Sequence, residues 1–398
     1  MASRRSLISL FSGAGGLDLG LEAAGFDARV CVEMDPNCVR TLRHNRPWPV
    51  IERDIHAVTG QEILDTAGLA RGDADLLCGG PPCQPFSKSA YWARGDTKRL
   101  DDPRASTLGE YMRVLEETLP KAFLLENVYG LTYEGKDEGM RFLRETLDGI
   151  NERTNSSYSF TFRVLNTADY GVPQIRERVF VLGARDGREF RFPWPQFADP
   201  EGTGRQETLF ELPPYRTAWD AIGDLDGIDH GEALRVTGKW AQLLPTIPEG
   251  QNYLWHTERG GGTPIFKWRS RYWSMLLKLA KDRPSWTVQA QPGSAIGPFH
   301  WRNRRLSARE LCRIQTFPDD YEVQGGITAV QRQLGNAVPS AMAEVLGLAM
   351  RRQFFDEQVP EIASLIPPRR EPAAPHPVRD VPEEFLTDLE WGTFNTSA

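Results

Sequence analysis

The segment LISLFSGAGG, residues 7–16, joins an apolar strand-like run to a glycine-rich turn, and an apolar face at Leu17, Leu21 and Ala24 follows it. Glycines let a backbone approach a ligand closely, and the N-terminus of the following helix favours a negatively charged group. The third glycine of the dinucleotide-binding fingerprint is missing, because Asp18 occupies its position. Taken alone, the segment is equally compatible with an ordinary tight turn.

Strand-like and helix-like segments alternate along residues 5–185. Apolar strand-like runs recur at 28–33, 74–78, 122–126 and 179–183. This alternation predicts an α/β fold with a mostly parallel sheet that is covered on both faces. Ligands of such folds bind at the carboxyl ends of the strands, so we expect a functional site at that edge.

Turn-rich sequence begins near residue 187 and carries eight of the eleven tryptophans. Helical periodicity returns at 307–314, where Ser307 and Glu310 have the spacing of a capping box, and again after Pro339. The pattern therefore predicts a chain organised in four parts. We expect a catalytic domain over 1–186, a second domain over 187–302, a segment over 303–352 that returns to the first domain, and a Pro-rich, flexible tail over 353–398.

The net charge of −7 hides an uneven distribution of charge. Between Arg235 and Leu306, twelve Lys or Arg stand against three acids, which gives this stretch +9 and leaves −16 for the rest of the chain. Phosphate binding depends on clustered Lys and Arg, so this stretch is a candidate nucleic-acid surface.

The remaining composition argues against several classes of site. The five cysteines are scattered and the six histidines lack ligand spacing, so we expect neither disulfides nor a metal. There is no run of 18 apolar residues and no signal-peptide pattern at the N-terminus, so we expect an intracellular protein without a membrane partner.

Cys83 lies in GGPPCQPFS, residues 79–87, directly after an apolar run. The two prolines before it stiffen the backbone and present the thiol from a turn, whereas the other four cysteines are typical small core residues. Glu126 ends a second apolar run, LLENV, at 124–128. A buried acid is costly unless it is paired or functional, and burial raises its pKa. An acid that merely holds a neighbouring loop is the alternative.

The run QIRERVF, residues 174–180, places Gln174, Arg176 and Arg178 on one side of a predicted strand. Such arginines can hold a phosphate or a carbonyl oxygen, and they can equally form ordinary salt bridges. The run QLGNAVP, residues 333–339, precedes an apolar helix and by itself indicates only a turn and a helix start.

In this order the motifs resemble the ordered set of the cytosine-C5 DNA methyltransferases of bacterial restriction-modification type. The matching blocks are the FSGAGG loop, the PCQ nucleophile, the ENV strand, the QxRxR strand and the GNAVP turn, with RLSARE and QTFPD before the last of them. The resemblance spans roughly residues 5–350. It implies a Rossmann-like, S-adenosylmethionine-dependent methyltransferase domain with a smaller inserted target recognition domain at 187–302.

The resemblance also implies a binding pocket for S-adenosylmethionine, which becomes S-adenosylhomocysteine in the reaction. Glu33 would lie on the ribose and Met34 against the adenine, while Asp54 would contact the adenine amino group. Arg53 departs from the glycine that the family usually has there. The implied cofactor residues are Phe11, Ser12, Gly13, Ala14, Gly15, Gly16, Leu17, Glu33, Met34, Asp54, Ile55, Pro81, Asn336, Ala337 and Val338.

For catalysis the resemblance implies that Cys83 adds to carbon 6 of a cytosine and thereby activates carbon 5. Glu126 would hydrogen-bond or protonate N3, and Arg178 with Arg176 would hold the O2 carbonyl. The cytosine would be flipped out of duplex DNA, and residues 87–104 would form a mobile loop over it. The residues implied at the DNA are Gln84, Ser87, Lys88, Trp92, Arg94, Arg99, Lys267, Arg269 and Arg271.

The partners expected from the resemblance are duplex DNA and a cognate restriction endonuclease, the latter functional rather than a stable subunit. We expect a monomer in the bacterial cytoplasm, associated with the nucleoid through DNA. Three alternatives stay open: an RNA cytosine-C5 methyltransferase on the same scaffold, a catalytically inactive DNA-binding relative, and a small-molecule or adenine methyltransferase. Activity on each substrate would separate them.

Overall fold

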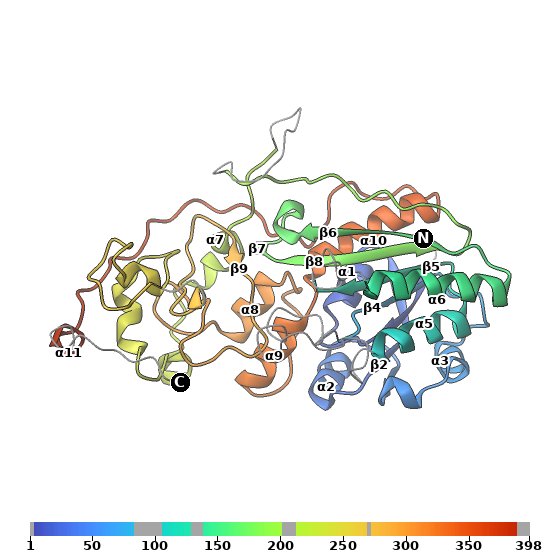
Figure 1. Ribbon diagram of the computed structural model, residues 1–398, viewed down its shortest axis with the longest axis horizontal. Coiled ribbons are helices and arrows are strands. Elements are labelled where there is room, and N and C mark those ends of the chain that lie inside the picture. Colours follow the sequence, from blue (N-terminus) through green and yellow to red (C-terminus); the bar gives the residue numbers. More distant parts are fainter. Residues whose placement is uncertain (1–3, 83–105, 129–137, 201–211, 269–271, 388–398) are drawn as a thin grey trace.

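The computed structural model describes residues 4–82, 106–128, 138–200, 212–268 and 272–387 (Figure 1). Its main sheet has seven strands in the order β3-β2-β1-β4-β5-β8-β6. In chain order they are β1 (Arg5–Leu10), β2 (Phe26–Glu33), β3 (Val50–Glu52), β4 (Leu76–Gly79), β5 (Ala122–Asn127), β6 (Ser159–Asn166) and β8 (Glu177–Ala184). Neighbours from β3 to β5 are parallel, and β8 is antiparallel to both of its neighbours. The predicted α/β fold with a mostly parallel sheet is confirmed.

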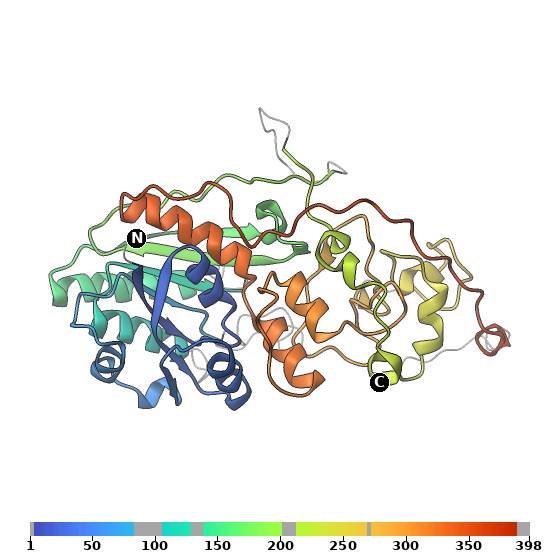
Figure 2. The ribbon, with the colours of Figure 1, turned by 180° about the vertical axis from the view of Figure 1, so that it is seen from behind.

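Helices cover both faces of this sheet (Figures 1 and 2). One face carries α1 (Gly16–Ala23), α2 (Pro36–Asn45) and α10 (Ser340–Phe354), and the other carries α3 (Gly60–Ala67), α5 (Ser106–Thr118) and α6 (Glu138–Thr154). Consecutive side chains of a strand point to opposite faces. In β1, therefore, Leu7 belongs to the core beneath α1 and α10, whereas Ile8 belongs to the core beneath α3, α5 and α6.

The end of the chain returns to its beginning, because α10 packs directly on α1. A Cβ atom at Gly20 would lie 2.1 Å from the Ser340 carbonyl oxygen, so only glycine permits this approach of the two backbones. The preceding helices are α8 (Ala308–Ile314) and α9 (Ile327–Asn336). The capping box predicted at the start of α8 is confirmed, since the Ser307 and Glu310 side chains each accept from the other residue's backbone N–H.

Residues 212–301 form most of a second body beside the sheet, on the left in Figure 1. It is built mainly from short turns and 3-10 helices around its own apolar cluster, which includes Leu243, Tyr253 and Phe299. Its attachments to the rest of the chain, within the described residues, include the helix α7 (Ala218–Ile222) and the strand β9 (Ser285–Trp286). α7 shares the main core with α8, and β9 pairs in parallel with β7 (Gln174–Ile175). The domain boundaries expected near 186, 302 and 352 remain predictions.

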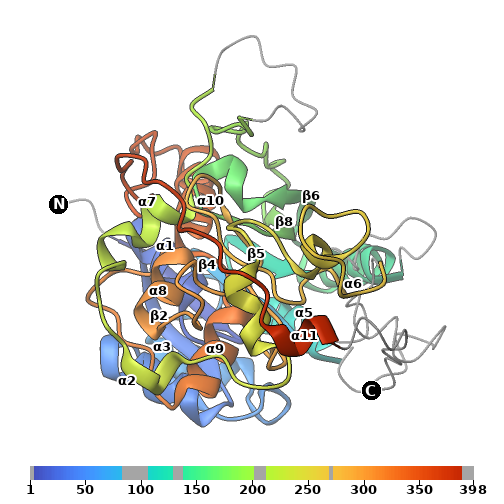
Figure 3. The same ribbon diagram turned by 90° about the vertical axis from the view of Figure 1, so that its left-hand side faces the viewer.

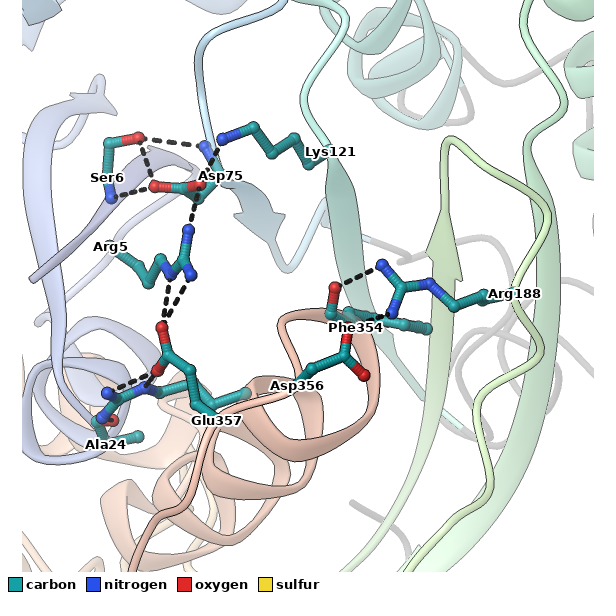
Figure 4. A network of polar contacts seen from close by, with 10 residues as sticks. Arg5, Ser6, Ala24, Asp75, Lys121, Arg188, Phe354, Asp356 and Glu357 are labelled. Atoms are coloured by element: carbon teal, nitrogen blue, oxygen red, sulfur yellow. Dashed lines mark hydrogen bonds and ion pairs between the residues drawn. The ribbon is translucent and has the colours of Figure 1, made fainter.

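A network of ion pairs fixes the point where the tail leaves α10 (Figure 4). Arg5 donates to Glu357 at 2.8 Å and to Asp75 at 3.2 Å. Arg351 also donates to Glu357, and Lys121 lies 2.8 Å from the Asp75 carboxylate. The network therefore joins the first strand of the sheet to the start of the tail.

The tail then crosses both bodies to α11 (Glu383–Thr387), as Figure 3 shows. Glu344, which is 2% exposed, accepts hydrogen bonds from the Ser364 and Leu365 backbone N–H groups at 2.7 and 2.8 Å. Further along, Phe385 is buried in the cluster of the second body. Composition predicts a flexible tail over 353–398, and its flexibility stays a prediction. Residues 354–387 make these contacts because buried carboxylates elsewhere in the fold, Glu344 and Asp220, accept from their backbone N–H groups. Residues 388–398 lie outside the described part.

We expect Glu344→Ala to lower the free energy of unfolding by about 2–4 kcal/mol, because it leaves buried N–H groups without their charged acceptor. Urea denaturation measures the loss, and limited trypsin digestion should show new cleavage at Arg369 and Arg370. Glu361→Ala, at an exposed carboxylate of the same tail, is the control and should change stability by less than about 0.5 kcal/mol. Equal stability and equal digestion of both variants would contradict the role given to Glu344.

Candidate active site

A cavity of about 760 Å³ opens at the carboxyl ends of β1, β2, β4 and β5. Its wall combines segments that are far apart in sequence, and these include residues 9–14, 33–35, 53–56, 80–82, 126–128 and 332–338. This is the edge of the sheet at which the sequence predicts a site.

The glycine-rich turn forms one wall of the cavity and has an unusual backbone. Phe11 and Gly13 both have positive φ angles, 54° and 56°, and for Phe11 this is a strained conformation of the kind that clusters at functional sites. A Cβ atom at Gly13 would meet nothing closer than 4.0 Å, so this glycine keeps the cavity open rather than relieving a clash. The Tyr321 hydroxyl donates to the Ala14 carbonyl at 2.9 Å and holds the turn from behind.

Glu33, at the end of β2, faces this turn. Its carboxylate accepts the Gly13 N–H at 2.8 Å and the Asp35 N–H at 2.7 Å, and burial raises its pKa. The next residue, Met34, has a side chain that is 62% exposed and lines the cavity. A hydrogen-bonding carboxylate and an exposed apolar side chain thus lie side by side.

Asp54 and Ile55 line the same cavity from the loop after β3. Ile55 is buried, whereas Asp54 is exposed and accepts the His56 backbone N–H at 3.0 Å. Hydrogen bonds from His56 hold the pKa of Asp54 below its ordinary value. Arg53, the departure from the family pattern, forms an ion pair with Glu62.

The turn at 335–338 closes the cavity from the other end of the chain. Asn336, Ala337 and Val338 all line it, and a Cβ atom at Gly16 would lie 2.3 Å from the Val338 carbonyl oxygen. The first and last motifs of the sequence are therefore in backbone contact.

Glu126, at the end of β5, also lines the cavity. It is 8% exposed, and its Oε1 lies 3.1 Å from Nε of Arg178. Burial raises the pKa of Glu126, and the positive charges of Arg178 and Arg176 oppose that rise. A Cβ atom at Gly80 would lie 2.9 Å from Glu126 Oε2, so the glycine before Pro81 makes room for the carboxylate.

Arg176 has different surroundings from Arg178, although both line the cavity. It is 1% exposed and donates to the Gly335 carbonyl at 2.9 Å and to the Val288 carbonyl at 3.4 Å. The single strand predicted over 174–180 is wrong, because β7 ends at Ile175 and pairs with β9 while β8 begins at Glu177 and joins the main sheet. Arg176 therefore lies between two strands that belong to different sheets.

Several of the predicted residues lie outside the described part of the chain. These are Cys83, Gln84, Ser87, Lys88, Trp92, Arg94, Arg99, Arg269 and Arg271. Pro81 and Pro82, which precede Cys83, line the cavity beside Glu126. Lys267 is exposed on the second body, next to Trp268.

A family model described as C-5 cytosine-specific DNA methylase matches residues 5–352. The chain belongs to this family. It is an S-adenosylmethionine-dependent enzyme that methylates carbon 5 of cytosine in DNA.

Relatives of this methyltransferase cover most of its length. M.SacI of Streptomyces achromogenes, a type II methyltransferase, is 43% identical over 372 residues, which span 87% of this chain and 93% of the relative. The type II methyltransferase M1.HphI of Haemophilus parahaemolyticus is 32% identical over 88% of this chain and 87% of its own length. M.AquIA of Picosynechococcus sp., also a type II methyltransferase, is 45% identical over 56% of this chain and 89% of its own length.

Solved structures agree with the fold of this methyltransferase. A putative DNA modification methyltransferase encoded within a prophage of E. coli superposes with a TM-score of 0.62 at 23% identity and covers 89% of this chain and 100% of its own. Spodoptera frugiperda DNMT2 gives a TM-score of 0.58 at 17% identity, covering 87% of this chain and 99% of its own. At these identities the likeness shows the fold alone.

Two absences concern only the described residues of the methyltransferase. Within them, no group of three or more His, Cys, Asp or Glu is arranged to hold a metal ion. None of the helices in the same ranges is long and apolar enough to cross a membrane.

Asp18 lines the cavity of the methyltransferase but was not predicted from the sequence as a site residue. Asp18, which the sequence singles out only as a missing glycine, is fully buried in the first turn of α1 and lines the cavity. Its Oδ2 atom forms no hydrogen bond with any of the described residues, and burial raises the pKa of Asp18 to about 6. An acid between Leu17 and Leu19, on an apolar helix face, was the available signal.

Asp18 predicts a specific pH dependence of stability. Because its pKa is about 6 in the folded chain and 3.8 ordinarily, the folded state binds more protons between these values, and stability falls as the pH rises through them. We expect Asp18→Asn to gain about 1–2 kcal/mol of stability relative to the wild type between pH 5 and pH 8. Urea denaturation at both pH values measures this, with Asp73→Asn at an exposed carboxylate as the control. A pH-independent difference would refute the burial of a titrating Asp18.

Proposed function

We propose that this methyltransferase modifies one cytosine, flipped out of the helix, within a short duplex sequence, as the modification enzyme of a type II restriction-modification system. The observation that carries the proposal is the Glu126–Arg178 pair, 3.1 Å apart, at the same cavity as the glycine-rich turn and the two prolines that precede Cys83. The identity of 43% to M.SacI over 93% of its length supports the type II assignment. A monomer would act on the DNA, with the endonuclease as a separate protein in the same cytoplasm.

The residues around the cavity fit S-adenosylmethionine. Its volume of about 760 Å³ accommodates a nucleoside with an amino-acid chain. Glu33 would accept the ribose hydroxyls, Met34 and Ile55 would pack on the adenine, and Asp54 would accept its amino group. The turns at 11–17 and 335–338, together with Pro81, would enclose the methionine end. When bound, this cofactor supplies an electrophilic methyl group.

The chain's own residues would activate the cytosine. Carbon 5 is a poor nucleophile, so a bond from the Cys83 sulfur to carbon 6 makes the ring an enamine that reacts at carbon 5. Glu126 would donate a proton or hydrogen bond to N3, which stabilises the charge that develops as sulfur adds. Its raised pKa keeps such a proton available closer to neutral pH. Loss of the carbon 5 proton to a base and cleavage of the carbon–sulfur bond then restore the ring.

Arg178 would hold the cytosine O2 oxygen while it orients Glu126. Its Nε lies 3.1 Å from Glu126 Oε1 and its Nη1 donates to the neighbouring Glu177 carbonyl at 2.7 Å, so Nη2 would donate to the cytosine O2. Arg176, in contrast, has both terminal nitrogens committed to backbone carbonyls. We therefore assign Arg176 to positioning and Arg178 to the substrate.

Duplex DNA would lie between the two bodies. A cytosine that stays stacked in the duplex exposes neither face of its ring to the cavity, so the base would have to rotate out. Rotating the base out costs a few kcal/mol of stacking and pairing. Residues 87–104 follow Cys83 directly and would cover the base and fill the gap. On the second body, exposed Lys267 lies beside Trp268, over whose ring Arg259 stacks at 4.2 Å. Such a basic and aromatic surface suits a phosphate backbone.

We expect the full chain to transfer labelled methyl groups from S-adenosylmethionine to unmethylated duplex DNA at carbon 5 of cytosine within one short motif, which bisulfite sequencing maps. Cys83→Ala should lose the transfer completely, because the cysteines of the described residues, Cys31, Cys38, Cys78 and Cys312, are all buried and cannot replace its thiol. Cys312→Ala, at a buried thiol on α8, is the matched control. Label on RNA but not on DNA would replace this proposal with an RNA methyltransferase, and modification spread over all cytosines would remove the sequence-specific role.

Glu126→Gln should slow methyl transfer by about 10²–10⁴-fold, because the amide cannot deliver a proton to N3. Isothermal titration should give the same affinity for S-adenosylhomocysteine within about threefold, since Glu126 lies at the cytosine end of the cavity. Glu52→Gln, at an exposed carboxylate on β3, should leave both quantities unchanged. A rate within tenfold of the wild type would show that Glu126 only holds the neighbouring loop.

A further inference from the structure

Two buried glutamines form a direct hydrogen bond at the junction of the two bodies. Gln174 in β7 donates from Nε2 to Oε1 of Gln315 at 2.8 Å, and both residues are 0% exposed. They are separated by 141 positions in the chain, and neither belongs to the wall of the cavity as lined by the described residues. A buried amide pair is costly unless both partners are fully satisfied, so their remaining contacts are informative.

Gln174 holds the second body. Its Oε1 accepts the Val288 backbone N–H at 2.9 Å, directly after β9. The Thr287 hydroxyl donates to the Ile175 carbonyl at 2.8 Å, which extends the β7–β9 pairing by one more residue. Residues 285–288 are thus fixed to the strand that leads into Arg176 and Arg178.

Gln315 holds the turn that closes the cavity. Its side-chain Nε2 donates to the Leu334 carbonyl, and its backbone carbonyl accepts the Ser340 N–H at 3.1 Å. The residues between Leu334 and Ser340 include Asn336 and Val338, which line the cavity. The amide of Gln315 therefore sets where the last turn of α9 ends.

Arg176 and a glycine add a second connection between the same two segments. The guanidinium donates to both the Val288 and the Gly335 carbonyls. A Cβ atom at Gly335 would lie 2.3 Å from the Ala290 backbone nitrogen, so the two backbones are in contact. Neither segment can shift without moving the other or breaking buried hydrogen bonds.

We propose that the Gln174–Gln315 pair is a positioning element that couples DNA binding by the second body to cofactor binding at the 335–338 turn. The inference rests on the proposed function, which gives the DNA to one segment and S-adenosylmethionine to the other. DNA bound to the second body would reorient residues 285–288 and thereby move Gln174. Gln315 would follow Gln174 to keep the hydrogen bond between them, and the turn at 335–338 would shift with Gln315. Such coupling is reciprocal, so the cofactor tightens DNA binding by the same factor.

The test titrates S-adenosylhomocysteine into the full chain, alone and with a saturating duplex that carries the mapped target site. In the wild type we expect DNA to raise the affinity by about fivefold or more. Gln174→Met and Gln315→Met should each bring that factor, the ratio of the affinity with DNA to the affinity without DNA, close to one. The affinity without DNA is measured for each variant, so that a direct loss of cofactor binding is not counted as a loss of coupling. The double variant should lose no more than either single variant, because the two residues act as one pair.

Gln353→Met is the matched control. Gln353 also bridges two segments, by hydrogen bonds with the Arg191 N–H and carbonyl at 2.8 and 2.9 Å, but it lies on α10 away from both segments. In this variant DNA should raise the affinity for S-adenosylhomocysteine by the same factor as in the wild type. Thermal denaturation checks folding, and if one Met variant does not fold, the other decides alone. A factor that stays within twofold of the wild type in the Met variants, or a wild-type factor of one, overturns the inference. Methylation by the wild type tests the proposed function separately, so the two failures are distinguishable.

Discussion

The contact between the first turn and the last turn of the catalytic region is the constraint on which the rest of the structure depends. A Cβ atom at Gly16 would lie 2.3 Å from the Val338 carbonyl and one at Gly20 would lie 2.1 Å from the Ser340 carbonyl. Two helices that approach this closely need glycine on one side along a whole helical turn. The contact brings the two ends of a long chain to one cavity, so the intervening residues must leave the sheet and return. The second body is formed by residues of this intervening part of the chain.

The sequence could predict those parts of the molecule that depend on local pattern. Five of the seven strands of the main sheet, β1, β2, β4, β5 and β8, follow from apolar runs, because strands inside a covered sheet bury both of their faces. The edge strands β3 and β6 carry no such run and were not predicted. The residues around the cavity follow from motifs that end those strands, such as Glu33 and Glu126. They gather because the carboxyl ends of parallel strands lie at one edge. Local pattern and global fold agree in these segments, so local reasoning suffices.

The remaining features depend on contacts that no local pattern contains. Arg176 was predicted to act beside Arg178, since alternation puts both on one side of a strand. The strand is interrupted, and Arg176 lies between Val288 and Gly335, which are more than 100 residues away in sequence. The tail is similar. Its composition predicts no fold of its own, and it is held by Glu344, an acid among the buried residues of α10. Long-range partners of buried polar groups decide both cases.

The charge counted along the sequence also differs from the charge that is free in space, and this difference bears on the proposed DNA binding. The stretch from 235 to 306 carries +9 when counted along the sequence. In space, acids from outside the stretch approach its arginines: Arg302 pairs with Asp226 at 2.7 Å, and Arg304 pairs with Glu310 at 2.7 Å. Lys278 and Lys281 are almost fully buried. Lys278 donates to the Ile247 carbonyl of the second body, and Lys281 donates to the Ala374 carbonyl of the tail. Much of the excess charge thus stabilises the fold of the second body. The attraction for phosphates that we propose for it would rest on the smaller number of basic side chains that reach the surface, and the count along the sequence does not identify them.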